Sequence, residues 1–224
     1  MPIVRQLRLK FRTAVSHARR DFVVSPSNAA AIAALDAWPT WPGGSLALIG
    51  PAGCGKTHLA CDWAARRGAT VVRRVDPELT DPPSGAILLE DADQGVADET
   101  LFHLINRADA GATLLVTARS LPQTWPVALP DLRSRLNALV VAQIDEPDDI
   151  VLEGVLRKFF RERNIKPAED LFPYLLRRIE RSAPAAKDVV SRLDELADAE
   201  EREVTRALAR RLLEQEDRTL DLFD

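Results

Sequence analysis

The sequence predicts an α/β fold in which a mainly parallel five-stranded sheet with crossover helices is followed by a small all-helical subdomain. Up to Pro147, short apolar runs alternate with amphipathic stretches, as they do where helices connect parallel strands. After Pro147 only helical periodicity remains. The 224 residues are enough for one such core and a small subdomain, but not for two full-sized domains.

Five short apolar runs are of the buried-strand type. They lie at 45–49, 70–72, 86–89, 113–116 and 139–142. Between or before them, helices are expected at 29–36, from 58 to 68, at about 97–109 and at 131–138. Ser27 and Asn28 are good N-caps for the first helix, and the stretch 38–44, rich in Pro and Gly, cannot continue it. These elements predict an α/β core over 21–146.

Four amphipathic stretches follow the core. They span 152–163, 170–181, 186–197 and 204–213, each with an apolar face opposite a charged one. We therefore expect a helical lid subdomain over 147–214. Residues 1–20 are expected to form a basic, weakly patterned arm before the core, and residues 215–224 a C-terminal tail.

The composition favours a folded protein of a reducing compartment. Apolar residues make up 46% and charged residues 29%, and the net charge of −4 argues against an overall electrostatic attraction for nucleic acid. Cys54 and Cys61 have no zinc-site spacing and are expected to be free thiols. No apolar run approaches the roughly 20 residues of a bilayer span, which favours a cytoplasmic protein with no membrane partner. An organelle transit peptide is the alternative interpretation of the Arg-rich N-terminus.

The strongest motif is a phosphate-binding loop at residues 50–57. Its residues are Gly50, Pro51, Ala52, Gly53, Cys54, Gly55, Lys56 and Thr57, which match G-x-x-x-x-G-K-[ST]. The motif lies between a predicted strand and a predicted helix, as it must. In such loops backbone N–H groups close on phosphate oxygens. We therefore expect Lys56 to reach the β- and γ-phosphates of ATP or ADP, and the Thr57 hydroxyl to ligate Mg²⁺.

Two adjacent acids follow the predicted strand 86–89. Glu90 takes the position of the metal ligand, and Asp91 the position of the residue that polarises the attacking water. Most ATPases of this kind have Asp first, so a carboxylate here is displaced by about one methylene, which costs catalysis more than binding. The order predicts weak intrinsic hydrolysis. Thr117 either places a polar group near the γ-phosphate or simply ends its strand.

Two arginines lie in the predicted helix 131–138. Arg133 and Arg135 are spaced so that they occupy different faces of that helix. An exposed guanidinium there can act as an arginine finger on the phosphate of a neighbouring subunit. In a chain this rich in arginine, a solvent-facing pair is the alternative.

The ordered set of landmarks resembles the AAA+ domain of the bacterial DnaA family and, more closely, the Hda group of DnaA regulators. The resemblance covers about 21–200 and rests on the segment 22–28, the phosphate-binding loop, Glu90-Asp91, the segments 117–122 and 132–136, and a helix around Lys187. It implies an AAA+ P-loop NTPase fold.

The resemblance also implies roles for individual residues. Val23, Val24 and Asn28 would line the adenine site, with His58 beside the phosphate-binding loop. Arg135 would be the finger that acts on a partner's ATP. Lys187 stands where the family usually has a nucleotide-sensing arginine, and lysine keeps the charge but loses the bidentate fork.

Both ends of the chain bear on the choice within the family. DnaA continues into a DNA-binding helix-turn-helix domain, whereas this chain has about 25 residues beyond Ala199, so direct sequence-specific DNA binding is not expected. Hda proteins begin with a peptide that docks on the DNA polymerase sliding clamp, and Gln6, Leu7, Leu9 and Phe11 match its Gln-Leu-x-Leu-x-apolar form. An edge strand or an unstructured arm is the alternative. Residues 219–223 resemble a second clamp-binding form, or an apolar tail.

Taken together, the resemblance implies a bacterial regulator that binds ADP or ATP with Mg²⁺. It would dock on the sliding clamp, the β subunit of DNA polymerase III, and present Arg135 to ATP on DnaA, so that re-initiation of replication is blocked. A homodimer and a larger AAA+ oligomer both stay open. The alternatives are a self-sufficient AAA+ ATPase, such as a helicase loader or transposition helper, and a short DnaA paralogue that coats DNA.

Overall fold

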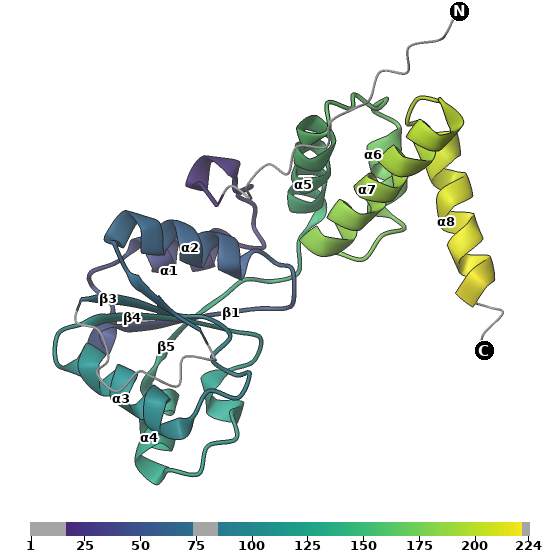
Figure 1. Ribbon diagram of the computed structural model, residues 1–224. Coiled ribbons are helices and arrows are strands. Elements are labelled where there is room, and N and C mark those ends of the chain that lie inside the picture. Colours follow the sequence, from purple (N-terminus) through teal and green to yellow (C-terminus); the bar gives the residue numbers. More distant parts are fainter. Residues whose placement is uncertain (1–16, 74–84, 221–224) are drawn as a thin grey trace, which may run out of the picture.

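The computed structural model describes residues 17–73 and 85–220, with side chains described as far as Glu214 (Figure 1). Five parallel strands form one sheet in the order β2-β3-β4-β1-β5. Their bounds are β1 Ser45–Ile49, β2 Thr70–Val72, β3 Ala86–Leu89, β4 Thr113–Ala118 and β5 Val140–Gln143. The predicted fold class is confirmed.

Helices cover both faces of the sheet. Their bounds are α1 Ala29–Asp36, α2 Lys56–Arg67, α3 Asp98–Asp109 and α4 Pro130–Ala138, and short 3-10 turns are η1 Arg19–Asp21, η2 Pro42–Gly44 and η3 Pro122–Thr124. α1 and α2 lie on one face, and α3 and α4 on the other (Figure 1). Leu46 and Leu48 of β1 pack with α1 and α2, whereas Ala47 and Ile49 pack with α3 and α4. The strands are therefore apolar on both faces, which is why they appear as continuous runs.

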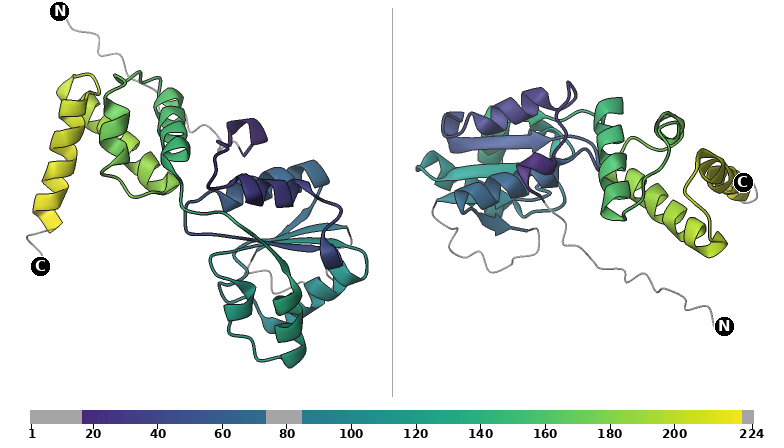
Figure 2. Two further views of the ribbon diagram at one scale, coloured as in Figure 1. Left: turned by 180° about the vertical axis from the view of Figure 1, so that it is seen from behind. Right: turned by 90° about the horizontal axis from the view of Figure 1, so that it is seen from above.

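Four helices make up a C-terminal helical region. They are α5 Asp149–Glu162, α6 Leu171–Leu176, α7 Ala183–Glu200 and α8 Arg206–Leu220. They share a hydrophobic cluster of their own, centred on Leu156, Phe160 and Leu193. This region lies beyond one end of the sheet (Figures 1 and 2). The predicted boundaries between the arm, core, lid and tail stay predictions.

Some element bounds differ from those predicted. β4 runs two residues further, to Ala118, because its partner β1 continues to pair as far as Ile49. β5 starts one residue later than expected. α6 ends at Leu176 rather than near 181, because the N–H groups of Arg178 and Ile179 both turn back to the Leu175 carbonyl. α8 continues to Leu220, past the expected end of the lid at 214.

Among the residues that the structure describes, no helix has the length and apolarity needed to span a membrane.

Candidate functional site

The phosphate-binding loop wraps the N-terminus of α2. Gly50, Gly53 and Gly55 have φ angles of 153°, 73° and 108°, which side-chain-bearing residues rarely adopt. A Cβ on Gly50 would lie 2.3 Å from the Ile144 carbonyl oxygen, so only glycine fits at the end of β1. Gly55 is the N-cap residue of α2 and Lys56 its first residue. The loop therefore presents the positive end of the α2 dipole, as an anion site requires.

Lys56 is buried within this loop. Its side chain is folded back so that Nζ donates to the Gly50 oxygen at 2.7 Å and to the Pro51 oxygen at 2.8 Å, and the residue is 8% exposed. In the described part of the chain, no carboxylate forms an ion pair with Lys56. Buried cations are normally paired with an anion. The centre of the loop is thus a positive site suited to phosphate.

Cys54 lies beneath the loop and is 3% exposed. Burial raises the pKa of its thiol, against the opposing effect of Lys56 nearby. At neutral pH this cysteine is therefore a protonated, unreactive packing residue. The expectation that both cysteines are free thiols is confirmed.

The start of α7 rests on the phosphate-binding loop. The Ala183 N–H donates to the Gly53 oxygen at 3.2 Å, and Ser182 caps α7 by accepting from the Ala185 N–H. A Cβ on Gly53 would lie 2.6 Å from Pro184 Cδ and 2.9 Å from Ser182 Cβ. Lys187 lies in the second turn of the same helix with an exposed side chain. The structure thus brings α7, the helix that carries Lys187, to the loop.

This close approach predicts a specific cost for Gly53→Ala. The variant must strain a residue at φ 73° and also push α7 away from the loop. We expect it to lower the free energy of unfolding by about 2–4 kcal/mol, the sum of left-handed strain and overpacking. Gly95→Ala is the matched control, because Gly95 has φ 80° but open space around its Cβ position, and it should cost only about 1–2 kcal/mol. Equal losses in denaturant titrations would contradict the contact with α7.

The segment 22–28 joins the loop to α5. The Phe22 ring covers Gly55, where a Cβ would lie 2.7 Å from Phe22 Cε2. Val23 packs against α5 so closely that a Cβ on Gly154 would lie 2.6 Å from Val23 Cγ2. Val24 is 55% exposed. Of the two valines predicted for the adenine site, Val23 therefore packs against α5, and Val24 is exposed to solvent.

Asn28 has a different local role from the one expected. It occupies the N-cap position of α1, but its side chain makes no cap hydrogen bond. Instead, Oδ1 accepts from the Ser25 N–H at 3.0 Å and Nδ2 donates to the Val23 oxygen at 2.9 Å. The prediction of a capping side chain is wrong because these bonds hold the turn that carries the two valines.

His58 contacts the segment before this turn. Its ring lies edge-on to Phe22 and to His17, with centroid distances of 5.2 Å and 5.5 Å, and its Nε2 is 3.0 Å from the Ala18 oxygen. Burial lowers the pKa of His58, which keeps the ring neutral at neutral pH. The contacts of His58 thus fix residues 17–22 over α2. These residues had been expected to belong partly to a free arm.

Glu90, Asp91 and Thr117 meet at the carboxyl ends of β3 and β4. Thr117 is 1% exposed, and its Oγ1 accepts from the Asp91 N–H at 3.0 Å. Glu90 forms an ion pair with Arg73 at 3.3 Å. The Gly50 N–H donates to the Ala118 oxygen, so this edge of the sheet adjoins the phosphate-binding loop. The structure therefore brings the three residues together beside the loop, as their order along the strands predicts.

The same edge can accept Mg²⁺ only together with a nucleotide. The described residues contain no group of three His, Cys, Asp or Glu side chains placed to hold a metal. Mg²⁺ commonly takes one or two protein oxygens and completes its shell with phosphate and water. Exposed Thr57 and partly buried Glu90 fit that mode.

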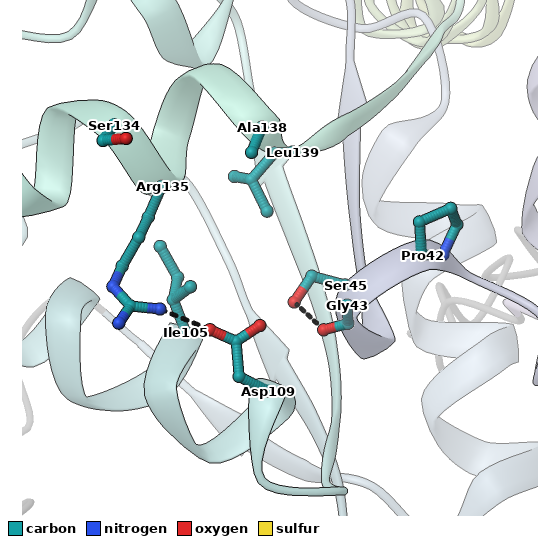
Figure 3. Close-up of a pocket in the computed structure, with 9 residues that line it drawn as sticks. All are labelled: Pro42, Gly43, Ser45, Ile105, Asp109, Ser134, Arg135, Ala138 and Leu139. Atoms are coloured by element: carbon teal, nitrogen blue, oxygen red, sulfur yellow. Dashed lines mark hydrogen bonds and ion pairs between the residues drawn. The ribbon is translucent and has the colours of Figure 1, made fainter.

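Arg135 lies far from this edge. It extends from α4 to an ion pair with Asp109 at the end of α3 (Figure 3). The pair borders a cavity of about 370 Å³, which is also lined by Gly43 and Ser45, at the beginning of β1. The phosphate-binding loop follows the other end of β1, roughly 13 Å away at the usual rise of a strand. Arg135 and the loop of the same molecule are therefore not brought together.

Arg133 has a structural role. Its Nη1 donates to the Gln123 oxygen at 2.7 Å and its Nη2 to the Trp125 oxygen at 2.6 Å. Arg133 therefore ties η3 to α4, whereas Arg135 is partly exposed and pairs with the exposed Asp109. Sequence reasoning missed Asp109 as a partner because the two residues are 26 positions apart and no local pattern joins them.

The candidate clamp-binding residues Gln6, Leu7, Leu9 and Phe11 lie outside the described residues, as do Leu222 and Phe223. Leu220 is the last residue of α8.

The sheet order, the phosphate-binding loop and the helical region that touches it match the fold of AAA+ domains of known structure. The crystal structure of domain III of the Thermotoga maritima replication initiator DnaA superposes with a TM-score of 0.71, at 19% identity over 89% of this chain and 96% of that chain. A DnaA bound to AMPPCP and single-stranded DNA gives 0.64 at 18% identity, over 83% and 68%. A Thermotoga maritima RuvB variant gives 0.68 at 14% identity, over 89% and 72%. Because these three structures are less than 20% identical to this chain, their similarity establishes its fold alone.

The sequence comparison points the same way. The chain is 26% identical to the chromosomal replication initiator DnaA of Thermomicrobium roseum over an alignment of 219 positions, which covers 84% of this chain and 47% of that protein. The chain thus spans about half the length of this relative. No protein-family model matches the chain. The protein has the fold of DnaA domain III and a sequence similar to that of DnaA.

Proposed function

We propose that this protein is an adenine-nucleotide-binding AAA+ regulator that docks on the sliding clamp and stimulates hydrolysis of ATP bound by DnaA. The observation that carries the proposal is the separation of Arg135 from the phosphate-binding loop of its own chain. An arginine at the opposite end of β1 can complete the site only of a neighbouring molecule. Fingers supplied in this way are worth about 10³–10⁵ in rate.

The protein's own site supports nucleotide binding. Lys56 is a buried cation that contacts two neutral carbonyls and a thiol, and the loop adds the α2 dipole. A DnaA of this fold binds AMPPCP, an analogue of ATP. In this proposal ADP or ATP lies with its phosphates on residues 50–57 and its adenine beside Val23 and Val24, and Thr57 and Glu90 bind Mg²⁺.

The catalytic edge supports slow hydrolysis by the protein alone. The Glu90 carboxylate is engaged by Arg73, and Asp91 has a left-handed backbone with φ 49°. The Glu90 carboxylate is thus held by a cation and is not free over the loop. This arrangement favours a regulator, whose own nucleotide has a structural role, and argues against a self-sufficient ATPase. Acting in trans on DnaA after the clamp is loaded would prevent re-initiation in a bacterial cytoplasm.

The clamp contact is tested with two variants of the candidate docking peptide. Gln6→Ala combined with Leu9→Ala should abolish capture by purified sliding clamp, because these side chains supply the polar and apolar anchors of the peptide. Arg8→Ala combined with Lys10→Ala is the matched control, since it alters the intervening positions of the same peptide and should retain capture. Melting temperatures of both variants show whether any loss arises from unfolding. Retained capture by the first variant would move the contact to Leu220, Leu222 and Phe223.

A further inference from the structure

Two residues of α3 hold the guanidinium of Arg135. Asp109, the last residue of α3, accepts a hydrogen bond from Arg135 Nη1. Phe102, seven positions earlier on the same helix, has its ring centroid 5.3 Å from Arg135 Cζ. The side chain therefore leaves α4 and points toward the end of α3 (Figure 3).

Asp109 also lies close to η2. A Cβ on Gly43 would lie 3.3 Å from Asp109 Oδ1, so the carboxylate rests against η2 as well as facing Arg135. The cavity beside the pair is lined by Arg135 and Asp109 themselves and, next to Arg135, by Ser134, Ala138 and Leu139. The cavity therefore leaves space beside the pair into which the Arg135 side chain can move without displacing the core.

We propose that Asp109 is a positioning residue that retains Arg135 on α3 until a partner's nucleotide site takes the guanidinium over. Asp109 then sets the protein concentration at which the partner is stimulated, but not the rate of the stimulated reaction. The inference rests on the proposed function, because it assigns Arg135 the trans role argued above.

The strength of the pair suits this task. The side chains of Arg135 and Asp109 are 35% and 46% exposed, so the pair is of the weak, partly solvated kind. A triphosphate carries more charge than one carboxylate and can bind the guanidinium fork at two oxygens. Because Asp109 holds Arg135 in most molecules, only a fraction of them have a guanidinium free to enter the partner's site. The apparent affinity for the partner is lowered in proportion to that fraction. The negative charge of Asp109 also repels an approaching triphosphate.

Asp109→Asn is the direct test. The assay measures ATP hydrolysis by DnaA in the presence of clamp-loaded DNA and increasing concentrations of the variant. The variant concentration that gives half-maximal stimulation should be about two- to fivefold lower than for the parent, while the maximal rate stays unchanged. Asp109→Glu should restore the parent value, since it keeps the charge. Glu214→Gln is the matched control, because it breaks the ion pair with Arg210 on α8 and should change neither quantity.

Other outcomes overturn the inference. An unchanged half-maximal concentration, or a lower maximal rate, would show that Asp109 does not restrain the finger. A melting temperature several degrees lower with both quantities worsened would assign it a structural role.

A second measurement on the protein alone separates this inference from the proposed function. The Nη1–H protons of Arg135, which donate to Asp109, can be followed by ¹⁵N NMR and assigned from their loss in Arg135→Ala, and they should exchange with water faster in Asp109→Asn than in the parent. Unchanged exchange defeats the inference even if DnaA is stimulated. If exchange is faster in Asp109→Asn but the parent protein does not stimulate DnaA, the proposed function is wrong, and so is the restraining role of Asp109. The result would then show only that the ion pair exists.

Discussion

Lys56→Ala is expected to weaken binding of ADP and ATP by about 30-fold or more, because removing one partner of a buried charge contact costs about 2 kcal/mol or more. The ammonium lies 8% exposed at the centre of the phosphate-binding loop, where water replaces its contact with phosphate poorly. Isothermal titration calorimetry of the nucleotide-free protein measures the change.

The fold should survive this substitution. Lys56→Ala loses two hydrogen bonds to the carbonyls of Gly50 and Pro51, but it also removes a cation from a buried position, and the two effects oppose each other. Lys166→Ala is the control, since Lys166 is an exposed lysine between α5 and α6. If both variants bound nucleotide as the parent does, the assignment of residues 50–57 as the phosphate site would be wrong.

The strands of this protein could be predicted well because their signals are local. Interior strands between Gly and Pro punctuation appear as continuous apolar runs, and β1, β2 and β3 were placed with the bounds that the structure has. β4 was predicted two residues short because Thr117 is polar, although it is almost fully buried. Its hydroxyl accepts a hydrogen bond from the Asp91 N–H, and that partner lies just beyond the end of another strand, β3.

The contacts that organise the candidate site could not be predicted from local sequence signals. The motif located the phosphate-binding loop, but nothing near Gly53 in the sequence indicates that α7 rests on it, 129 or more positions later. The Asn28 side chain was predicted to cap α1 from residue type alone, and it lost that role to a competing turn. Arg133 and Arg135 looked alike in the sequence. Only the fold shows that one holds η3 and the other faces Asp109.

Arg135→Ala is expected to remove the stimulation of ATP hydrolysis by DnaA, a loss of about 10³-fold or more if the finger makes its usual contribution. A positive group placed at a site with little water stabilises the transition state far more than it would in bulk solvent. Folding should be nearly unchanged, because the ion pair with Asp109 is partly exposed and such pairs contribute about 0–1 kcal/mol. Nucleotide binding should also persist, since Arg135 lies at the other end of β1.

The structure changes which arginine can serve as a control for this experiment. Arg133 cannot, because Arg133→Ala leaves the carbonyls of Gln123 and Trp125 without their donors and should lower stability. Arg161, an exposed residue of α5, is the better choice, and Arg161→Ala should stimulate DnaA as the parent does.

Arg135→Lys distinguishes a finger from a simple positive charge. Lysine retains the charge but presents a point donor on a flexible stem, so it cannot reproduce the planar fork that binds two phosphate oxygens. We therefore expect poor rescue, with most of the stimulation still lost, in assays of DnaA with clamp-loaded DNA. Full activity of the lysine variant would mean that charge alone is needed. Full activity of Arg135→Ala would show that the protein acts on DnaA through another contact, or that DnaA is not its partner.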